Sequence, residues 1–177
     1  MRVLVVHGSH LGSTAEIAER IGSVLETAGF QVIVRPAGQE AGSSTAEAFD
    51  AFVIGGGIYG GRWHPDAVAF IRRHAETLLA KPTWLFSSGP LGVNGRTAEP
   101  REPVELSELA PLIHARGHAV FAGAHDRSLV EGSELTRLEK FIARRFVPEG
   151  DWRDWSTIEG WARSIASELV PTPVSAL

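Results

Sequence analysis

The residues best suited to chemistry lie together near the N-terminus, where residues 7 to 14 read His-Gly-Ser-His-Leu-Gly-Ser-Thr. The apolar run from Val3 to Val6 leads into this segment, and a helical pattern follows it. A strand, a hydroxyl-rich loop and a helix N-terminus form an anion site, because free backbone N–H groups and the positive end of the helix dipole favour a phosphate there. The segment therefore predicts a phosphate site formed by Ser9, His10, Leu11, Gly12, Ser13 and Thr14.

Two common phosphate-binding motifs do not fit this loop. The loop of nucleoside triphosphatases has the pattern G-x-x-x-x-G-K-[ST], but Gly8 and Gly12 are spaced differently and no lysine follows them. The dinucleotide pattern G-x-G-x-x-G is absent from residues 7 to 14 as well. Since the loop has no fixed cation, it suits a single phosphomonoester. The alternative interpretation is a helix that is simply well capped.

Two later segments supply further candidate binding residues. Residues 55 to 60, Gly-Gly-Gly-Ile-Tyr-Gly, match the dinucleotide pattern formally, but the next helix is expected to begin only at Pro65. A glycine-rich turn beside aromatic residues better suits a backbone that approaches a flat ligand closely. The alternative for the aromatic residues is ordinary packing at the base of a loop. The candidates are Gly56, Gly57, Ile58, Tyr59, Gly60 and Trp63, followed by Ser87, Ser88, Gly89, Pro90, Leu91 and Gly92.

Alternating strand and helix patterns position these segments. Apolar runs predict strands at residues 2–6, 31–35, 52–57, 83–86 and 118–122. Helical patterns occupy residues 13–28, 46–50, 65–79, 104–116, 133–146 and 155–169. Ser13 with Glu16 and Ser156 with Glu159 fit capping boxes, and Gly29 fits the end of the first helix.

Strands that alternate with helices predict a parallel sheet covered on both faces. Right-handed crossovers and a phosphate at the first loop favour a doubly wound α/β fold, with three layers and a five-stranded sheet in the order 2-1-3-4-5. In that order strands one, three and four are neighbours. The loops at their carboxyl ends, residues 7–14, 55–64 and 87–95, then meet in one crevice. We expect a single domain over residues 1–170 and a loose tail over 171–177.

Composition excludes several other functions. The chain of 177 residues contains no cysteine, which rules out disulfides, thiolate catalysis and cysteine-held iron–sulfur clusters. A net charge of −4 argues against a nucleic-acid surface. The histidines near the expected crevice, His7, His10, His64 and His125, have no metal-ligand spacing, so no metal site is predicted.

The same sequence gives an expectation about location. No apolar run approaches the roughly 20 residues that a transmembrane helix needs, and the strand-like run at the start of the chain does not resemble a signal peptide. We therefore expect a cytoplasmic protein, and leave open a peripheral membrane contact.

The pattern Ser9-x-x-Gly12-Ser13-Thr14 after a first strand, together with the two later loops, resembles the flavodoxin family. That family binds FMN non-covalently, with the phosphate in the first loop and the flavin ring between the other two. The usual first loop of that family has six positions, in the order hydroxyl residue, any residue, Thr, Gly, any residue and Thr. In this sequence Leu11 stands in place of the first Thr. The resemblance covers roughly residues 1–165 and implies FMN as the cofactor of the candidate residues named above.

Within that family, the chain is similar to the group that includes the menaquinone-dependent protoporphyrinogen oxidases. The segments that carry this similarity are residues 53–63, 84–92, 121–124 and 148–155. The resemblance implies an oxidoreductase that passes electrons through a non-covalent flavin, with a quinone, a porphyrinogen or a reductase protein as redox partner. A flavodoxin-type electron carrier and a flavin-free binding module remain alternatives, and no catalytic acid or base is assigned.

Overall fold

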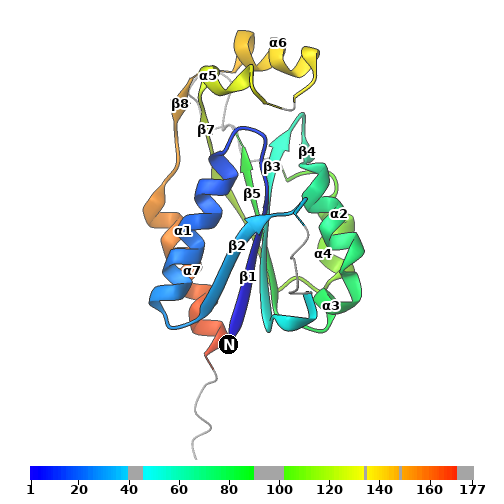
Figure 1. Ribbon diagram of the computed structural model, residues 1–177, viewed down its shortest axis with the longest axis vertical. Coiled ribbons are helices and arrows are strands. Elements are labelled where there is room, and N and C mark those ends of the chain that lie inside the picture. The colour runs from blue at the N-terminus through cyan, green and yellow to red at the C-terminus, as the bar shows by residue number, and fades with distance from the viewer. Residues whose placement is uncertain (40–45, 90–101, 134, 148, 171–177) are drawn as a thin grey trace, which may run out of the picture.

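The computed structural model describes residues 1–39, 46–89, 102–133, 135–147 and 149–170 of the chain. Its centre is a parallel sheet with strands in the order β2-β1-β3-β5-β6 (Figure 1). Taken in chain order, these strands have the predicted order 2-1-3-4-5, so the doubly wound topology is confirmed. Their bounds are β1 Arg2–Gly8, β2 Gln31–Pro36, β3 Ala51–Tyr59, β5 Thr83–Gly89 and β6 Gly117–Ala122.

Helices cover both faces of this sheet (Figure 1). On one face α1 and α7 contribute to an apolar cluster in which Ile17 and Phe86 are buried. On the other face α2, α3 and α4 contribute to a second cluster, which contains Leu4 and Phe70. The bounds of these helices are α1 Ser13–Thr27, α2 Pro65–Arg73, α3 Ala75–Leu79, α4 Leu106–Leu112 and α7 Trp155–Leu169.

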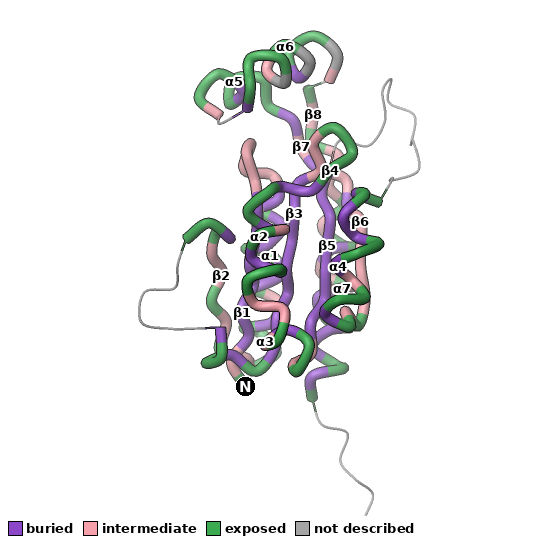
Figure 2. The backbone as a smooth tube through the Cα atoms, turned by 90° about the vertical axis from the view of Figure 1, so that its right-hand side faces the viewer, coloured by how far each residue is buried: buried purple, intermediate pink, exposed green. Residues whose placement is uncertain are grey.

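The central strands are buried along most of their length (Figure 2). Val3 to Val6 of β1 and Phe52 to Ile54 of β3 have no exposed surface, which is typical of strands covered on both faces. The parallel register brings the carboxyl ends of these strands to one edge of the sheet. There Gly8 lies opposite Gly56 and Gly57 lies opposite Ser88, so the segments after these strands meet at that edge.

A smaller part of the chain lies beyond this carboxyl edge (Figure 1). β7 Ala124–His125 pairs with β8 Gly150–Asp151 in a two-stranded antiparallel sheet. Between these strands lie α5 Arg127–Val130 and α6 Arg137–Phe146, which Figure 2 shows beyond the end of the main sheet rather than on its faces. We call residues 124–151 the cap segment. None of the helices in the described ranges is long and apolar enough to cross a membrane.

The capping box predicted at Ser13 and Glu16 is wrong. α1 is preceded by Gly12 in a left-handed conformation, with φ of 85°, and no side chain caps its first turn. The Ser13 hydroxyl instead accepts a hydrogen bond from the backbone amide of Ala124 at 2.8 Å. The Ser13 hydroxyl thus contacts a distant segment instead of the first turn of its own helix. The spacing of residues in the sequence does not reveal such a contact. The end of the helix is as predicted, because Gly29 follows it with φ of 93°.

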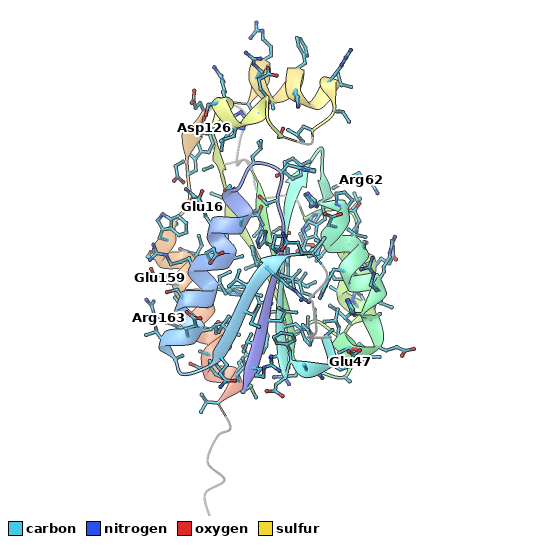
Figure 3. All side chains as sticks on the ribbon, viewed as in Figure 1. Glu16, Glu47, Arg62, Asp126, Glu159 and Arg163 are labelled. Carbon is cyan, nitrogen blue, oxygen red and sulfur yellow. The ribbon has the colours of Figure 1, made fainter. Side chains whose placement is uncertain are left out.

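The second capping box, Ser156 with Glu159, is also wrong. Asp154 caps α7, and its carboxylate accepts a hydrogen bond from the backbone amide of Ser156 at 3.0 Å. A carboxylate is favoured there because it also interacts with the positive end of the helix dipole. Glu159 instead forms ion pairs with Arg20 and Arg163; Figure 3 labels the acid and the second of these bases.

The glycine-rich turn expected at residues 55–60 is mostly strand. β3 continues to Tyr59 and forms a hairpin with β4 Arg62–Trp63 through Gly60 and Gly61. Both turn glycines have positive φ, 58° and 80°, a conformation that glycine adopts without a steric cost. Several predicted helices are shorter than expected: residues 46–50 contain only the 3₁₀ turn η1 Ala46–Ala48, and residues 65–79 are divided at His74 into α2 and α3.

Candidate functional site

A cavity of about 200 Å³ lies where the predicted loops meet at the carboxyl edge of the sheet. The first loop, the end of β3, the end of β5 and the cap segment all contribute to its walls, which are mostly apolar. Eight of the predicted binding residues line this cavity: Leu11, Ser13, Thr14, Ile58, Tyr59, Gly60, Ser88 and Gly89. The remaining lining residues are Gly123, Ala124, His125, Leu135, Ala143 and Val147.

The first loop presents backbone donors at the start of α1. The amide of Gly12 donates to the Ser9 hydroxyl at 3.0 Å, which closes the loop. The amide of Glu16 donates to the carbonyl of Gly12 at 3.0 Å, so pairing within the helix begins there. The amides of Ser13 and Thr14 come before that pairing and have no acceptor within the helix. Together with the dipole of a 15-residue helix, these amides favour an anion.

Tyr59 reaches from β3 onto this loop. Its hydroxyl oxygen accepts a hydrogen bond from the backbone amide of His10 at 3.0 Å, and the two rings meet edge-on with centroids 4.7 Å apart. A Cβ atom at Gly57 would lie 2.7 Å from the Tyr59 ring and 3.0 Å from the Thr14 hydroxyl, so this placement of the ring requires glycine. Burial raises the pKa of Tyr59, which keeps its hydroxyl neutral at physiological pH.

Histidines connect the first loop to α2. His64 lies at the start of α2, and its Nδ1 accepts a hydrogen bond from the amide of Asp66 at 3.3 Å, so the ring proton is on Nε2. His64 Nε2 lies 3.2 Å from His10 Nδ1, which therefore acts as the acceptor. These bonds fix the tautomers of both rings and hold the first loop against the start of α2. The pKa of the neighbouring His7 is lowered by burial and by the proximity of His64.

The segment after β6 closes another side of the cavity. A Cβ atom at Gly123 would lie 3.2 Å from the hydroxyl oxygens of both Ser13 and Ser88, so three separate segments converge at this point. The amide of Gly123 also donates to the carbonyl of Gly89 at 2.9 Å. The sequence predicted that the ends of strands one, three and four would meet, and the structure adds the end of the fifth strand to that group.

The first two glycines of the 55–57 run accommodate aromatic rings of the protein itself. A Cβ atom at Gly55 would collide with the Phe86 ring, and one at Gly56 would lie 2.9 Å from the Trp63 ring. The prediction assigned these glycines to the close approach of a ligand. The structure gives a different reason for them, since side chains from the neighbouring strands occupy the space.

Trp63 and Ser87 belong to a buried chain of hydrogen bonds. The Trp63 indole N–H donates to Ser87 Oγ at 2.7 Å, and Ser87 Oγ lies 2.8 Å from His118 Nε2. The His118 ring keeps its proton on the nitrogen that faces the Glu102 carboxylate, so Nε2 accepts from the Ser87 hydroxyl and the ring proton is on Nδ1. That nitrogen lies 3.5 Å from Glu102 Oε1. Burial lowers the pKa of His118, which is consistent with a neutral ring in this series of hydrogen bonds.

The other predicted residues within the described ranges do not line the cavity. Ser9, His10 and Gly12 shape the first loop without lining the cavity. Trp63 and Ser87 are 3% and 0% exposed and are not in the lining either. Gly56 and Gly57 lie within β3, under the Trp63 and Tyr59 rings. Pro90, Leu91 and Gly92 lie outside the described residues.

Sequence reasoning missed the lining residues of the cap segment. Leu135, Ala143 and Val147 reach the cavity from around α6, and no local pattern indicates that this helix lies near the first loop. His125 was considered only as a histidine near the crevice. It lines the cavity, it is 5% exposed, and burial lowers its pKa. Within the described ranges, no group of three or more His, Cys, Asp or Glu side chains is placed to hold a metal ion.

Comparison with known proteins gives a consistent result. The profile of the flavodoxin domain family matches residues 4–145. A curated relative from Escherichia coli strain K12, named protoporphyrinogen IX dehydrogenase (quinone), is 27% identical over 185 aligned positions, which cover 94% of this chain and 95% of that protein.

Solved structures support the same fold. A cysteine-to-serine mutant of flavodoxin from Pseudomonas aeruginosa matches with a TM-score of 0.61 and 17% identity, covering 96% of this chain and 99% of that one. A flavodoxin from Streptococcus pneumoniae TIGR4 matches with a TM-score of 0.59 and 15% identity, covering 96% of this chain and all of that one. The sheet order, the loops at its carboxyl edge and the family match agree, and the chain belongs to the flavodoxin domain family.

Proposed function

We propose that this chain binds FMN non-covalently and acts as an oxidoreductase that passes electrons from an organic donor to a quinone. The observation that carries the proposal is the position of the cavity. A loop rich in hydrogen-bond donors opens directly into a mostly apolar space at the carboxyl ends of β1, β3 and β5. In doubly wound sheets, ligands bind at this place.

The first loop fits the phosphate of FMN. The amides of Ser13 and Thr14 have no acceptor within α1, and the Thr14 side chain is nearly buried at 2% exposure. The amide of His10 already points to an oxygen atom, the hydroxyl of Tyr59, at 3.0 Å. A phosphate oxygen is a stronger acceptor than a neutral hydroxyl, because hydrogen bonds to charged groups are roughly twice as strong. We therefore infer that the phosphate replaces Tyr59 as the partner of this amide.

The remaining walls of the cavity fit a flat aromatic ring system. Leu11 and Ile58 supply apolar surface, and Tyr59 supplies an aromatic face. The volume of about 200 Å³ is below the roughly 300–1,000 Å³ of most ligand pockets.

When bound, FMN supplies reversible electron transfer, and the protein supplies binding, orientation and exclusion of water. Ser13 and Thr14 anchor the phosphate end. Ile58 and Gly89, from the ends of β3 and β5, border the space for the ring. The apolar residues of the cap segment, Leu135 and Ala143, keep water from the side opposite the sheet.

The relative from Escherichia coli supports the choice of redox partners. Its name specifies protoporphyrinogen IX as donor and a quinone as acceptor, and the similarity extends over nearly the full length of both chains. We extend the quinone to this chain as acceptor and a porphyrinogen as the first donor to test. The alternative of a pure electron carrier predicts reduction by a reductase protein alone.

The experiment compares the gel-filtered FMN-loaded protein with an equal concentration of free FMN under anaerobic conditions. Each sample receives protoporphyrinogen IX and a soluble quinone, and the appearance of porphyrin fluorescence is followed. The proposal predicts oxidation that requires the quinone and is at least tenfold faster with the protein than with free FMN. Equal rates for protein and free flavin with every small-molecule donor, combined with reduction by a reductase, contradict the enzyme and support the carrier.

A further inference from the structure

The outer side of α6 exposes large apolar side chains. α6 lies at the far end of the molecule, beyond the carboxyl edge of the sheet (Figure 1). Two of its apolar side chains are largely exposed, Leu138 at 67% and Phe141 at 60%. Leu129 of the neighbouring α5 is 50% exposed. Exposed apolar side chains that gather on adjacent helices mark an interaction surface more often than isolated ones do.

Basic side chains accompany these apolar residues. The ten residues of α6 include four that are Arg or Lys and a single Glu, which gives the helix a formal charge of +3. The whole chain has a charge of −4, so the rest of it carries −7. The positive charge is therefore concentrated on one element of an otherwise acidic protein, and that element is the one that also exposes apolar side chains.

Helical spacing places both kinds of side chain on one face. Arg137, Lys140, Phe141 and Arg144 stand at positions i, i+3, i+4 and i+7, which lie above one another on a helix. Ala143 belongs to the opposite face, where it is 9% exposed and lines the cavity. α6 thus has an inner face toward the candidate site and an outer face that combines cations with apolar surface.

The outer face also contains a shallow groove bordered by cations. The groove has a volume of about 440 Å³ and is lined by Glu131, Arg137, Lys140, Phe141, Arg144 and Arg145. Lys140 Nζ donates to the carbonyl of Glu131 at 2.8 Å, and Arg144 forms an ion pair with the Glu131 carboxylate. These two contacts hold α6 against the end of α5, so the arrangement of the groove is built into the cap segment.

We propose that the outer face of α6, together with Leu129, docks on the surface of a membrane that contains anionic phospholipids. Leu138 and Phe141 enter the boundary between headgroups and acyl chains, and the surrounding Arg and Lys side chains bind headgroup phosphates. A bilayer surface accepts apolar and cationic side chains at the same time. An acidic protein surface does so only if its own apolar and acidic side chains lie at positions that match those of α6.

Docking in this orientation has a consequence for the candidate site. Because Ala143 lines the cavity from the opposite face of the same helix, the cavity lies just behind the docked surface. An apolar electron acceptor dissolved in the bilayer would then approach the site from the side of the cap segment. This consequence rests on the proposed function, whereas the docking itself does not.

The test measures binding of the purified 177-residue chain to sedimenting vesicles, with and without added FMN. One set of vesicles contains phosphatidylcholine alone, and the other is rich in phosphatidylglycerol. Two double variants remove the proposed contacts, Leu138→Ser with Phe141→Ser and Arg137→Gln with Arg145→Gln. Matched controls remove two exposed apolar residues, Leu79→Ser with Val104→Ser, and two exposed cations, Arg73→Gln with Arg163→Gln. Circular dichroism and thermal melting verify that each variant folds.

The proposal predicts binding to phosphatidylglycerol vesicles that weakens with added salt, and at least tenfold weaker binding to phosphatidylcholine. Both α6 double variants should lose at least tenfold in affinity, and both controls should bind like the wild type. Absence of binding to either vesicle, or equal binding by folded α6 variants, overturns the proposal and leaves an acidic protein as the partner of this face. Loss of flavin-dependent activity would affect the proposed function but not this measurement.

Discussion

The hydroxyl oxygen of Tyr59 accepts a hydrogen bond from the backbone amide of His10 at 3.0 Å, although the two residues lie on different segments of the chain. The amide belongs to the loop that we assign to a phosphate, and the tyrosine belongs to the strand that borders the proposed ring site. A side chain of one half of the site therefore satisfies a donor of the other half in this structure. Binding of FMN and release of Tyr59 should be linked.

Replacing Tyr59 with Phe tests this link. The variant keeps the ring but removes the oxygen that competes with phosphate for the His10 amide. The lost hydrogen bond destabilises the ligand-free state by about 0.5–1.5 kcal/mol, so FMN should bind roughly two- to tenfold more tightly. Fluorescence titration with FMN measures the change.

Riboflavin, which lacks the phosphate, is the control for Tyr59→Phe. Because riboflavin does not compete for the His10 amide, its affinity should stay within about twofold of the wild-type value. A variant that binds FMN more weakly than the wild type would show that the hydroxyl contacts the bound flavin instead.

Thr14 provides a second test, since its side chain is 2% exposed and lies at the start of α1. Thr14→Val keeps the shape of the side chain and removes its hydroxyl. Loss of a hydrogen bond to a charged group costs about 1.5–3 kcal/mol, so the affinity for FMN should fall by roughly 10- to 150-fold. Thr14→Ser keeps the hydroxyl and is the matched control. Equal FMN affinity in the Val and Ser variants would place the phosphate elsewhere.

Much of this site was accessible from the sequence because each strand end is marked locally. The apolar run before Ser9 and the helical pattern after Thr14 predict a strand, a loop and a helix, which is what the structure contains. The parallel order of the strands then brings the loops together at one edge of the sheet, and Thr14, Tyr59 and Ser88 do line one cavity.

Acid should destabilise the protein through its buried histidines. Burial lowers the pKa of His7, His118 and His125, so the unfolded chain, whose histidines titrate near 6.5, binds more protons than the folded one below that pH. The free energy of unfolding should therefore fall as pH drops from about 7.5 to about 5, and level off once pH passes the lowered values.

Urea unfolding at several pH values across this range measures the effect. His118→Gln removes one of the titrating groups, so its stability should depend less steeply on pH than that of the wild type. Carboxylates with lowered pKa, such as Asp151, contribute only at more acidic pH, because their stabilisation is lost below their ordinary value. A wild-type stability that is constant across the range would contradict the neutral, buried state of these histidines.

Arg153 connects the cap segment to α1 and should contribute to stability. Its guanidinium donates to Glu16 Oε2 at 2.6 Å and to Asp151 Oδ2 at 2.6 Å, and it lies 4.6 Å from the centroid of the Trp155 ring (Figure 3 labels Glu16). Both acids are half exposed or more, which screens the ion pairs.

We expect Arg153→Met to lower the free energy of unfolding by about 1–2 kcal/mol, or the melting temperature by about 2–8 °C. Arg163→Met is the control, because Arg163 is exposed and forms its ion pair along its own helix with Glu159; its effect should stay below about 0.5 kcal/mol. Equal effects of the two substitutions would mean that Arg153 does not hold the cap segment to α1. Differential scanning calorimetry makes the comparison.

Several errors of the sequence predictions share one physical cause, which is contact between distant segments. Ser13 looked like a helix cap, but the Ala124 amide uses its hydroxyl. The glycines at 55 and 56 looked like a turn, but the rings of Phe86 and Trp63 fill the space that side chains there would need. The cap segment reaches the cavity through Ala143, and nothing in the local pattern around that residue indicates it.

The central claim is that the first loop holds the phosphate of FMN, and paired titrations of the purified protein with FMN and with riboflavin test it most directly. Several charge-assisted hydrogen bonds from the loop should make FMN bind at least a hundredfold more tightly, a difference of about 2.7 kcal/mol. Equal affinities for the two flavins, or no binding of FMN at all, would contradict the account.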